Sequence, residues 1–107
     1  MTMQHPPIDH ARLRREALRW LILLTLNNAR PIGAFELLVL SVAQSEYPDA
    51  TALELRRELD YLHDRELVKL DKQPSGRWHA ELTRHGVDVA EYTVTCEPGI
   101  ARPAKYW

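Results

Sequence analysis

The sequence has only one cysteine, no long apolar run and no glycine-rich loop. Cys96 alone cannot form an internal disulfide, so nothing suggests an oxidising compartment. The longest apolar run, Trp20 to Leu24, is far shorter than the ~20 residues of a membrane span. Residues 1–7 lack the apolar core of a signal peptide. We therefore expect a cytoplasmic protein without a membrane anchor.

Motifs for catalysis and metal binding are missing as well. No CxxC, HxxxH or HExxH spacing relates the five histidines to one another or to the cysteine. No serine lies in a GxSxG-like context. We therefore expect no enzyme activity, no metal and no cofactor.

Net charge is -1, but the charge is unevenly distributed. Residues 1–30 carry five arginines against two carboxylates, and residues 31–66 carry three arginines against eight carboxylates. Residues 67–107 carry six basic residues against five acidic ones. Positive charge thus gathers near the N-terminus and in the last third, while the middle is acidic.

A chain of 107 residues is long enough for one hydrophobic core and too short for two. We expect residues 1–9 to be a flexible leader, residues 10–92 to form the domain and residues 93–107 to be an extended tail. Asp9 caps a helix over about 10–27, a second helix spans about 35–44, and Asp49 or Thr51 caps a third that ends near residue 64. Strands at 67–71 and 77–82 flank a turn at 72–76, and Thr83 caps a fourth helix that ends near residue 92.

Each of these elements has a face that we expect to be buried. The expected buried residues are Leu13, Ala17, Leu21 and Leu24 in the first helix, Leu37, Leu38 and Leu40 in the second, Leu55, Leu59 and Leu62 in the third, and Trp78, Ala80 and Leu82 in the second strand. The stripe of the first helix is widened by Leu18, Trp20, Ile22, Leu23 and Leu26, so that the second half of the helix is apolar nearly all round. The domain must cover it on several sides, with or without help from a second subunit.

Two short patterns carry a resemblance to known proteins. They are Leu59-x-x-Leu62-x-x-x-x-Leu67-Val68, at the end of the third helix and the start of the first strand, and Leu82-Thr83-x-x-Gly86, where the second strand meets the fourth helix. With the order of elements over 10–92, they resemble bacterial winged-helix regulators of the MarR, PadR and ArsR type.

That resemblance implies a mainly α (α+β) winged helix-turn-helix fold. A three-helix core would carry a two-stranded β-wing, a fourth helix and the extended C-terminal tail. The long dimerising helices of MarR and PadR proteins are absent, so a homodimer would use the first helix or the tail. The whole chain, with its tail from Val94 to Pro103, is also similar to a small family of uncharacterised proteins from Mu-like transposable phages and prophages, which implies a bacterial host cell.

The resemblance also implies a DNA surface. In family members that read DNA, the third helix enters the major groove and the wing follows the phosphates. The matching residues are Arg56 and Arg57 on the third helix, with Lys72, Arg77 and His79 on the wing. The alternative is that Arg56–Asp60 and Glu54–Arg57 are solvated pairs at helical spacing.

Two functions therefore stay open at this stage. The first is a small DNA-binding protein for transcription regulation or DNA handling, with double-stranded DNA as partner. The second is a protein-interaction module that docks through its acidic third helix on a host or phage protein. The arginines of the first helix would contact an acidic partner or DNA backbone, or would simply keep the helix soluble. The terminal Tyr106 and Trp107 would be a docking element or disordered.

Overall fold

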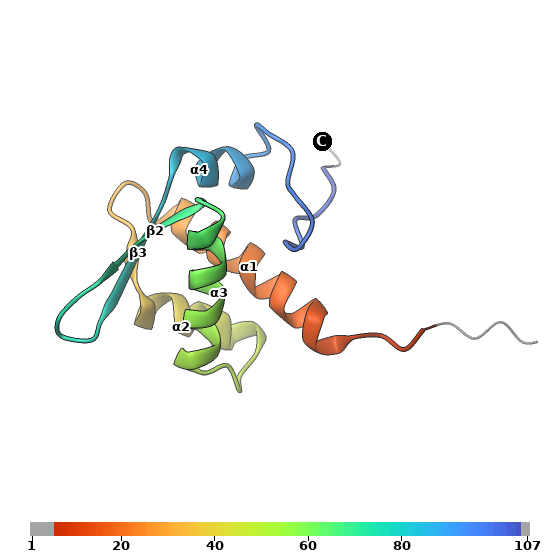
Figure 1. Cartoon of the computed structure of the whole chain (residues 1–107), viewed down its shortest axis with the longest axis horizontal. Coiled ribbons are helices and arrows are strands. Elements are labelled where there is room, and N and C mark those ends of the chain that lie inside the picture. The colour runs from red at the N-terminus through yellow and green to blue at the C-terminus, as the bar shows by residue number, and fades with distance from the viewer. Residues whose placement is uncertain (1–5, 106–107) are drawn as a thin grey trace, which may run out of the picture.

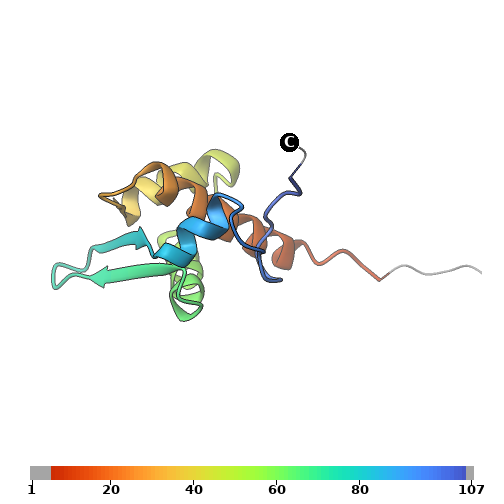
Figure 2. The same ribbon diagram turned by 90° about the horizontal axis from the view of Figure 1, so that it is seen from above.

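The computed structural model of the chain describes residues 6–105, which contain four helices and a three-stranded antiparallel sheet (Figure 1). The elements are α1 (His10–Asn28), β1 (Ala34–Phe35), α2 (Glu36–Glu46), α3 (Ala52–Asp64), β2 (Val68–Lys72), β3 (Trp78–Leu82) and α4 (Arg84–Ala90). Helices α1, α2 and α3 pack on one another, and the β2–β3 hairpin projects from them (Figures 1 and 2). The predicted mainly α fold with a projecting hairpin is confirmed.

Helix α1 begins where predicted, because the Asp9 carboxylate accepts a hydrogen bond from the Arg12 amide at 3.0 Å. Its buried residues are Leu18, Ile22, Leu23 and Leu26. The buried face thus consists of four residues that were expected only to widen the predicted stripe. Leu13 is 54% exposed, since at 3.6 residues per turn it lies about 140° around the helix from Leu18.

Helix α2 buries a different face from the one predicted. Val39 and Ala43, one turn apart, are each 1% exposed, while Leu37 is 67% and Leu38 55% exposed. The predicted Leu40 is half-buried. The inward-facing residues of α2 are thus Val39 and Ala43, and two of its leucines stay largely exposed.

Helix α3 follows the prediction. The Thr51 hydroxyl accepts a hydrogen bond from the Glu54 amide at 3.2 Å and caps the helix. Leu55, Leu59 and Leu62 are each at most 1% exposed and form the centre of the core with α1.

The sheet has one more strand than the sequence indicated, in the order β1–β3–β2. Ala34 and Phe35 of β1 pair with Ala80 and His79 of β3, although no strand was predicted at these two residues. Gly33 has φ +79°, and a side chain there would collide with the Ala80 carbonyl. The strand register puts two sets of residues on opposite sides of the sheet. The inner face carries Ala34, Val68, Leu70, Lys72, Trp78, Ala80 and Leu82, and the outer face carries Phe35, Lys69, Asp71, His79 and Glu81.

Helix α4 is capped by Thr83 as predicted, through a 3.0 Å bond from the Gly86 amide, and ends at Ala90, two residues early. The tail that follows packs back on the domain. Ile100 is only 8% exposed, and the amide of Ala101 donates to the Glu16 carbonyl of α1 at 3.1 Å. The terminal Tyr106 and Trp107, for which a docking role was considered, lie outside the described residues.

Candidate nucleic-acid interface

Helix α3 and the β2–β3 hairpin lie side by side and share a surface (Figure 1). Arg56 joins the two elements: its guanidinium donates to the Gly76 carbonyl in the hairpin turn at 2.7 Å and lies 4.7 Å from the centre of the Trp78 ring. We call the exposed side of α3 together with the hairpin the α3–hairpin surface. The structure thus brings the predicted helix and wing together.

The Arg56 guanidinium forms an ion pair within the protein. Its Nε donates to Oε2 of Glu36 at 2.6 Å, and a second nitrogen donates to Oε1 of the same carboxylate. This bidentate contact raises the pKa of Arg56 and lowers the pKa of Glu36, which is largely buried at the start of α2. Arg56 therefore holds α2, α3 and the hairpin together, and its guanidinium is already paired with a carboxylate.

Lys72 is also paired. Its Nζ lies 3.1 Å from Oδ1 of Asp60 on α3 and 4.3 Å from the centre of the Trp78 ring. Because Lys72 and Trp78 share the inner face of the sheet, this lysine turns toward α3. Lys72 therefore makes a second contact that holds α3 and the hairpin together, although its side chain stays half exposed.

Arg77 and His79 lie on the other side of the hairpin, around Phe35. The Arg77 guanidinium is 3.9 Å from the centre of the Phe35 ring, and the His79 ring meets the Phe35 ring edge-on at 4.9 Å. His79 is half-buried, whereas Arg77 is exposed and pairs with no carboxylate in residues 6–105. The three predicted wing residues are thus divided between two faces of the hairpin, with Lys72 on the inner face and Arg77 and His79 on the outer face.

Arg57 points outward from α3. It is exposed and has no carboxylate partner within the described chain. The alternative of local pairs on α3 is wrong, because Glu54 binds Arg14 and Asp60 binds Lys72. Of the five predicted residues, only Arg57 and Arg77 combine an exposed guanidinium with the lack of a carboxylate partner in residues 6–105.

Lys69 is a candidate that the sequence reasoning missed. It is exposed on the outer face of β2, next to Glu81 in the register, and forms no ion pair in the part of the chain that the structure describes. The alternation of β2 was the available signal, because it puts Lys69 and Leu70 on opposite faces.

Basic residues from other parts of the chain form ion pairs with many of the carboxylates in residues 31–66. Arg14 of α1 contacts Glu54 at 2.7 Å and Asp49 at 2.9 Å, and Arg19 contacts the buried Glu58 at 2.9 Å. Five of the eight carboxylates in residues 31–66 are in ion pairs. Arg14 and Arg19 therefore do more than keep α1 soluble, and much of the acidic charge on α3 is neutralised.

Residues 6–105 contain no candidate metal site. In this part of the chain, no three residues among the histidines, cysteine and carboxylates come close enough to hold a metal ion. None of the helices there combines the length and the hydrophobicity that crossing a membrane requires. Burial raises the pKa of the Cys96 thiol, so the reactive thiolate is disfavoured.

Comparison with known proteins finds a solved structure with a similar fold. No protein-family model matches the chain, and no curated protein is significantly similar to it in sequence. A crystal structure from Ralstonia eutropha JMP134, described as that of "a putative DNA-binding protein", superposes with a TM-score of 0.61 and 24% sequence identity. The match covers 73% of this chain and 95% of that one, so the two proteins are similar in fold.

Proposed function

We propose that this protein is a winged-helix protein that binds double-stranded DNA through the α3–hairpin surface, without catalysing a reaction. One observation carries the proposal. Arg56 of α3 donates to the Gly76 carbonyl in the hairpin turn. Arg57, which follows Arg56, and Arg77, which follows Gly76, are both exposed arginines without a carboxylate partner in residues 6–105. The similarity to a structure described as a DNA-binding protein adds support.

The proposed mode of binding follows from this arrangement. The exposed side of α3 would lie in the major groove, with Arg57 reaching a base edge or phosphate, and the hairpin would hold the flanking backbone through Arg77 and Lys69. His79 would contribute by supporting the Phe35 ring against which Arg77 lies. Arg56 and Lys72, which the sequence assigned to direct contacts, would instead hold the surface together.

With few unpaired cations, binding should be modest and only mildly salt-dependent. Each phosphate contact adds about 0.9 to the slope of log K against log salt concentration, so two arginines account for a slope of about -2. The net charge of -1 gives no long-range attraction to add to this local contact.

Fluorescence anisotropy with a labelled duplex at low salt tests the proposal. We expect Arg57→Ala combined with Arg77→Ala to weaken binding and to flatten the salt slope by about 2. The matched control is Arg15→Ala, which removes an exposed arginine from the N-terminal half of α1, a region remote from the hairpin tip (Figures 1 and 2). Wild-type protein that does not bind at low salt, or a double variant that binds as well as wild type, contradicts the proposal.

A protein-interaction module is the second candidate. Leu53 is 61% exposed on α3, close to Arg57 in the helix, and Glu46, Asp64 and Glu66 form no ion pair in the described part of the chain. An exposed leucine on a domain that carries such carboxylates suits a basic protein surface better than a phosphate backbone. Recovery of a partner from host lysate after nuclease treatment, and its loss with Leu53→Glu, would favour this candidate over DNA.

The proposed cellular role and origin of the protein rest on its resemblance to known families. A part in transcription regulation or in DNA handling, and an origin in a phage or prophage of a bacterial cell, stay predictions. The anisotropy experiment tests the DNA contact on which both roles depend.

A further inference from the structure

Two side chains that turn to opposite sides of α3 define the free face of this helix. Glu54 turns toward α1, where its carboxylate binds Arg14 at 2.7 Å. Arg56 turns toward α2 and the hairpin, where it binds Glu36 and the Gly76 carbonyl. At about 100° per residue, the two positions bound a sector about 160° wide that faces neither α1 nor the hairpin. We call this sector the free face of α3.

Leu53 and Arg57 lie at the centre of the free face. They are one turn apart along α3 and about 40° from each other around it, on either side of the midline of the sector. Leu53 is 61% exposed. Arg57 is exposed too, and it has no carboxylate partner within residues 6–105. An aliphatic group and an unpaired guanidinium therefore project from α3 side by side.

The carboxylates of the free face lie toward the other end of the helix. Asp60 is paired with Lys72 at 3.1 Å, and Asp64 is the last residue of α3, about 10 Å along the axis from Arg57. The N-terminal half of the free face is thus the half that does not repel a polyanion. In helix-turn-helix proteins, the N-terminal residues of the recognition helix contact base edges.

We infer that Leu53 and Arg57 read DNA sequence as a pair, with Leu53 against the 5-methyl group of a thymine and Arg57 on O6 and N7 of a guanine. This inference rests on the DNA binding proposed above. An arginine that binds both O6 and N7 selects guanine, and an apolar contact with the methyl group selects thymine. One helical turn rises about 5.4 Å and successive base pairs are about 3.4 Å apart, so the two bases lie within two base pairs of each other.

The free face lacks the groups that select the other two bases. Adenine is read by an asparagine or a glutamine, and α3 contains neither. Cytosine is read by a carboxylate, but Glu54 and Asp60 already bind Arg14 and Lys72.

A guanine also suits Arg57 better than a phosphate does. Arg57 lies near the middle of the free face, which is opposite the floor of the groove, whereas phosphates line the two edges of the groove. A guanidinium inside the groove still neutralises nearby phosphates, so Arg57 contributes to the salt dependence of binding as well.

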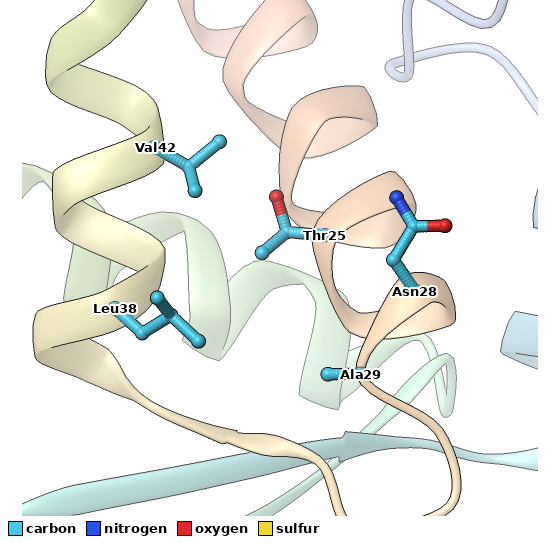
Figure 3. A pocket seen from close by; sticks show the side chains of 5 residues that line it. All are labelled: Thr25, Asn28, Ala29, Leu38 and Val42. Carbon is cyan, nitrogen blue, oxygen red and sulfur yellow. The ribbon is translucent and has the colours of Figure 1, made fainter.

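Leu38 of α2 is an exposed leucine outside the free face and provides a matched control. It is 55% exposed and lines a hollow of about 300 Å³ between α1 and α2, together with Thr25, Ala29 and Val42. Figure 3 shows Leu38 on the side of α2 that faces α1, with α3 behind the two helices. Leu38→Ala therefore removes a leucine of similar exposure that takes no part in the proposed readout.

Selection of binding sites from a duplex library with a random core, followed by fluorescence anisotropy, tests the inference. We expect the selected site to contain a thymine and a guanine within two base pairs. Deoxyuridine in place of that thymine removes only the methyl group and should weaken wild-type binding about two- to fourfold. 7-Deazaguanine in place of the guanine removes N7 and should weaken binding about tenfold. Both changes are made in the DNA, so their effect does not depend on how a variant folds.

Protein variants then assign each base to its residue. Leu53→Ala should abolish the deoxyuridine effect alone, Arg57→Ala should abolish the 7-deazaguanine effect alone, and Leu38→Ala should retain both effects. Wild-type protein that binds duplex without sequence preference, or that does not respond to the two analogues, overturns the inference and leaves DNA binding intact. An analogue effect that persists in the matching variant overturns it as well. Wild-type protein that binds no duplex at low salt contradicts the proposed function, and the inference with it.

Discussion

Arg56 of α3 donates to both carboxylate oxygens of Glu36, the first residue of α2, with 2.6 Å between Nε and Oε2. The same guanidinium reaches the Gly76 carbonyl in the hairpin turn. One side chain therefore fixes two helices and a hairpin relative to one another. Its neighbour Arg57 has no such role, so two adjacent arginines should respond differently to mutation.

Replacement of Arg56 by alanine should destabilise the fold, whereas replacement of Arg57 should not. Arg56→Ala leaves the largely buried Glu36 carboxylate without its cation and frees the hairpin turn from α3. We expect a lower melting temperature and faster hydrogen exchange of the hairpin amides for Arg56→Ala. Arg57→Ala should leave both unchanged and should affect only DNA binding. Equal melting temperatures for the two variants would contradict this division of roles.

The pair between Glu36 and Arg56 should also make stability depend on pH. Because the guanidinium lowers the pKa of Glu36 in the folded state, folding favours the ionised carboxylate. This stabilisation is complete above the unfolded-state pKa of glutamate and is lost as the pH falls through the lower, folded-state pKa. We therefore expect the difference in unfolding free energy between wild type and Glu36→Gln to shrink on acidification.

Urea unfolding at a series of acidic pH values measures this difference. Glu46→Gln is a suitable control, because Glu46 is exposed and forms no ion pair within residues 6–105. Its difference from wild type should stay flat over the same range. A gap between wild type and Glu36→Gln that widens at low pH would have the wrong sign for this mechanism.

Features that depend on a few neighbouring residues were predicted well. Asp9, Thr51 and Thr83 each cap the helix expected, because a side-chain oxygen there reaches an amide only three residues ahead. The hairpin followed from a short alternating pattern and a glycine turn. Strand β1 was missed because two residues are too few to show an alternating pattern.

Features that depend on distant partners were not predictable. Local spacing suggested Arg56 with Asp60, but Arg56 pairs with Glu36, twenty positions away, and Arg14 pairs with Glu54, forty positions away. The buried face of α2 was also misassigned, since its apolar residues lie on several sides and packing against the other helices selects one of them. As a result, the sequence did not show that Arg56 and Lys72, two of the five candidate DNA contacts, pair with carboxylates of the protein itself.

The ion pair of Glu58 and Arg19 should be the most costly one to break. Glu58 is 4% exposed, and Arg19 also donates to the Gly99 carbonyl at 2.9 Å and lies 3.5 Å from the centre of the Tyr61 ring. Glu58→Ala leaves a largely buried guanidinium without its carboxylate, which typically costs roughly 3–5 kcal/mol. Urea unfolding measures the loss.

An exposed pair provides the comparison. Arg12→Ala breaks an i, i+4 contact with Glu16 in which the arginine is 69% exposed, and should cost at most about 0.5 kcal/mol. Combining Arg19→Met with Glu58→Leu should recover much of the stability lost in Glu58→Ala, because neither charge is then buried alone. A cost for Glu58→Ala as small as that for Arg12→Ala would show that water reaches and solvates the Arg19 guanidinium.

Gly86 should tolerate alanine poorly, although alanine normally stabilises a helix by about 1 kcal/mol relative to glycine. The first turn of α4 lies directly on the backbone at the start of β2, and a Cβ atom at Gly86 would collide with the Leu67 carbonyl oxygen. That oxygen also accepts a hydrogen bond from the Thr83 amide at 3.1 Å, so it cannot move without loss of a contact that anchors the helix. Relief of the collision must push α4 away from the core and expose part of Val89.

We expect Gly86→Ala to lower the unfolding free energy by about 1–3 kcal/mol, the usual range for overpacking. His85→Ala, at an exposed position one residue earlier, should leave the unfolding free energy nearly unchanged. Thermal unfolding of the two variants decides the matter, and a rise in melting temperature for Gly86→Ala would mean that helix propensity outweighs the close approach of α4 to β2.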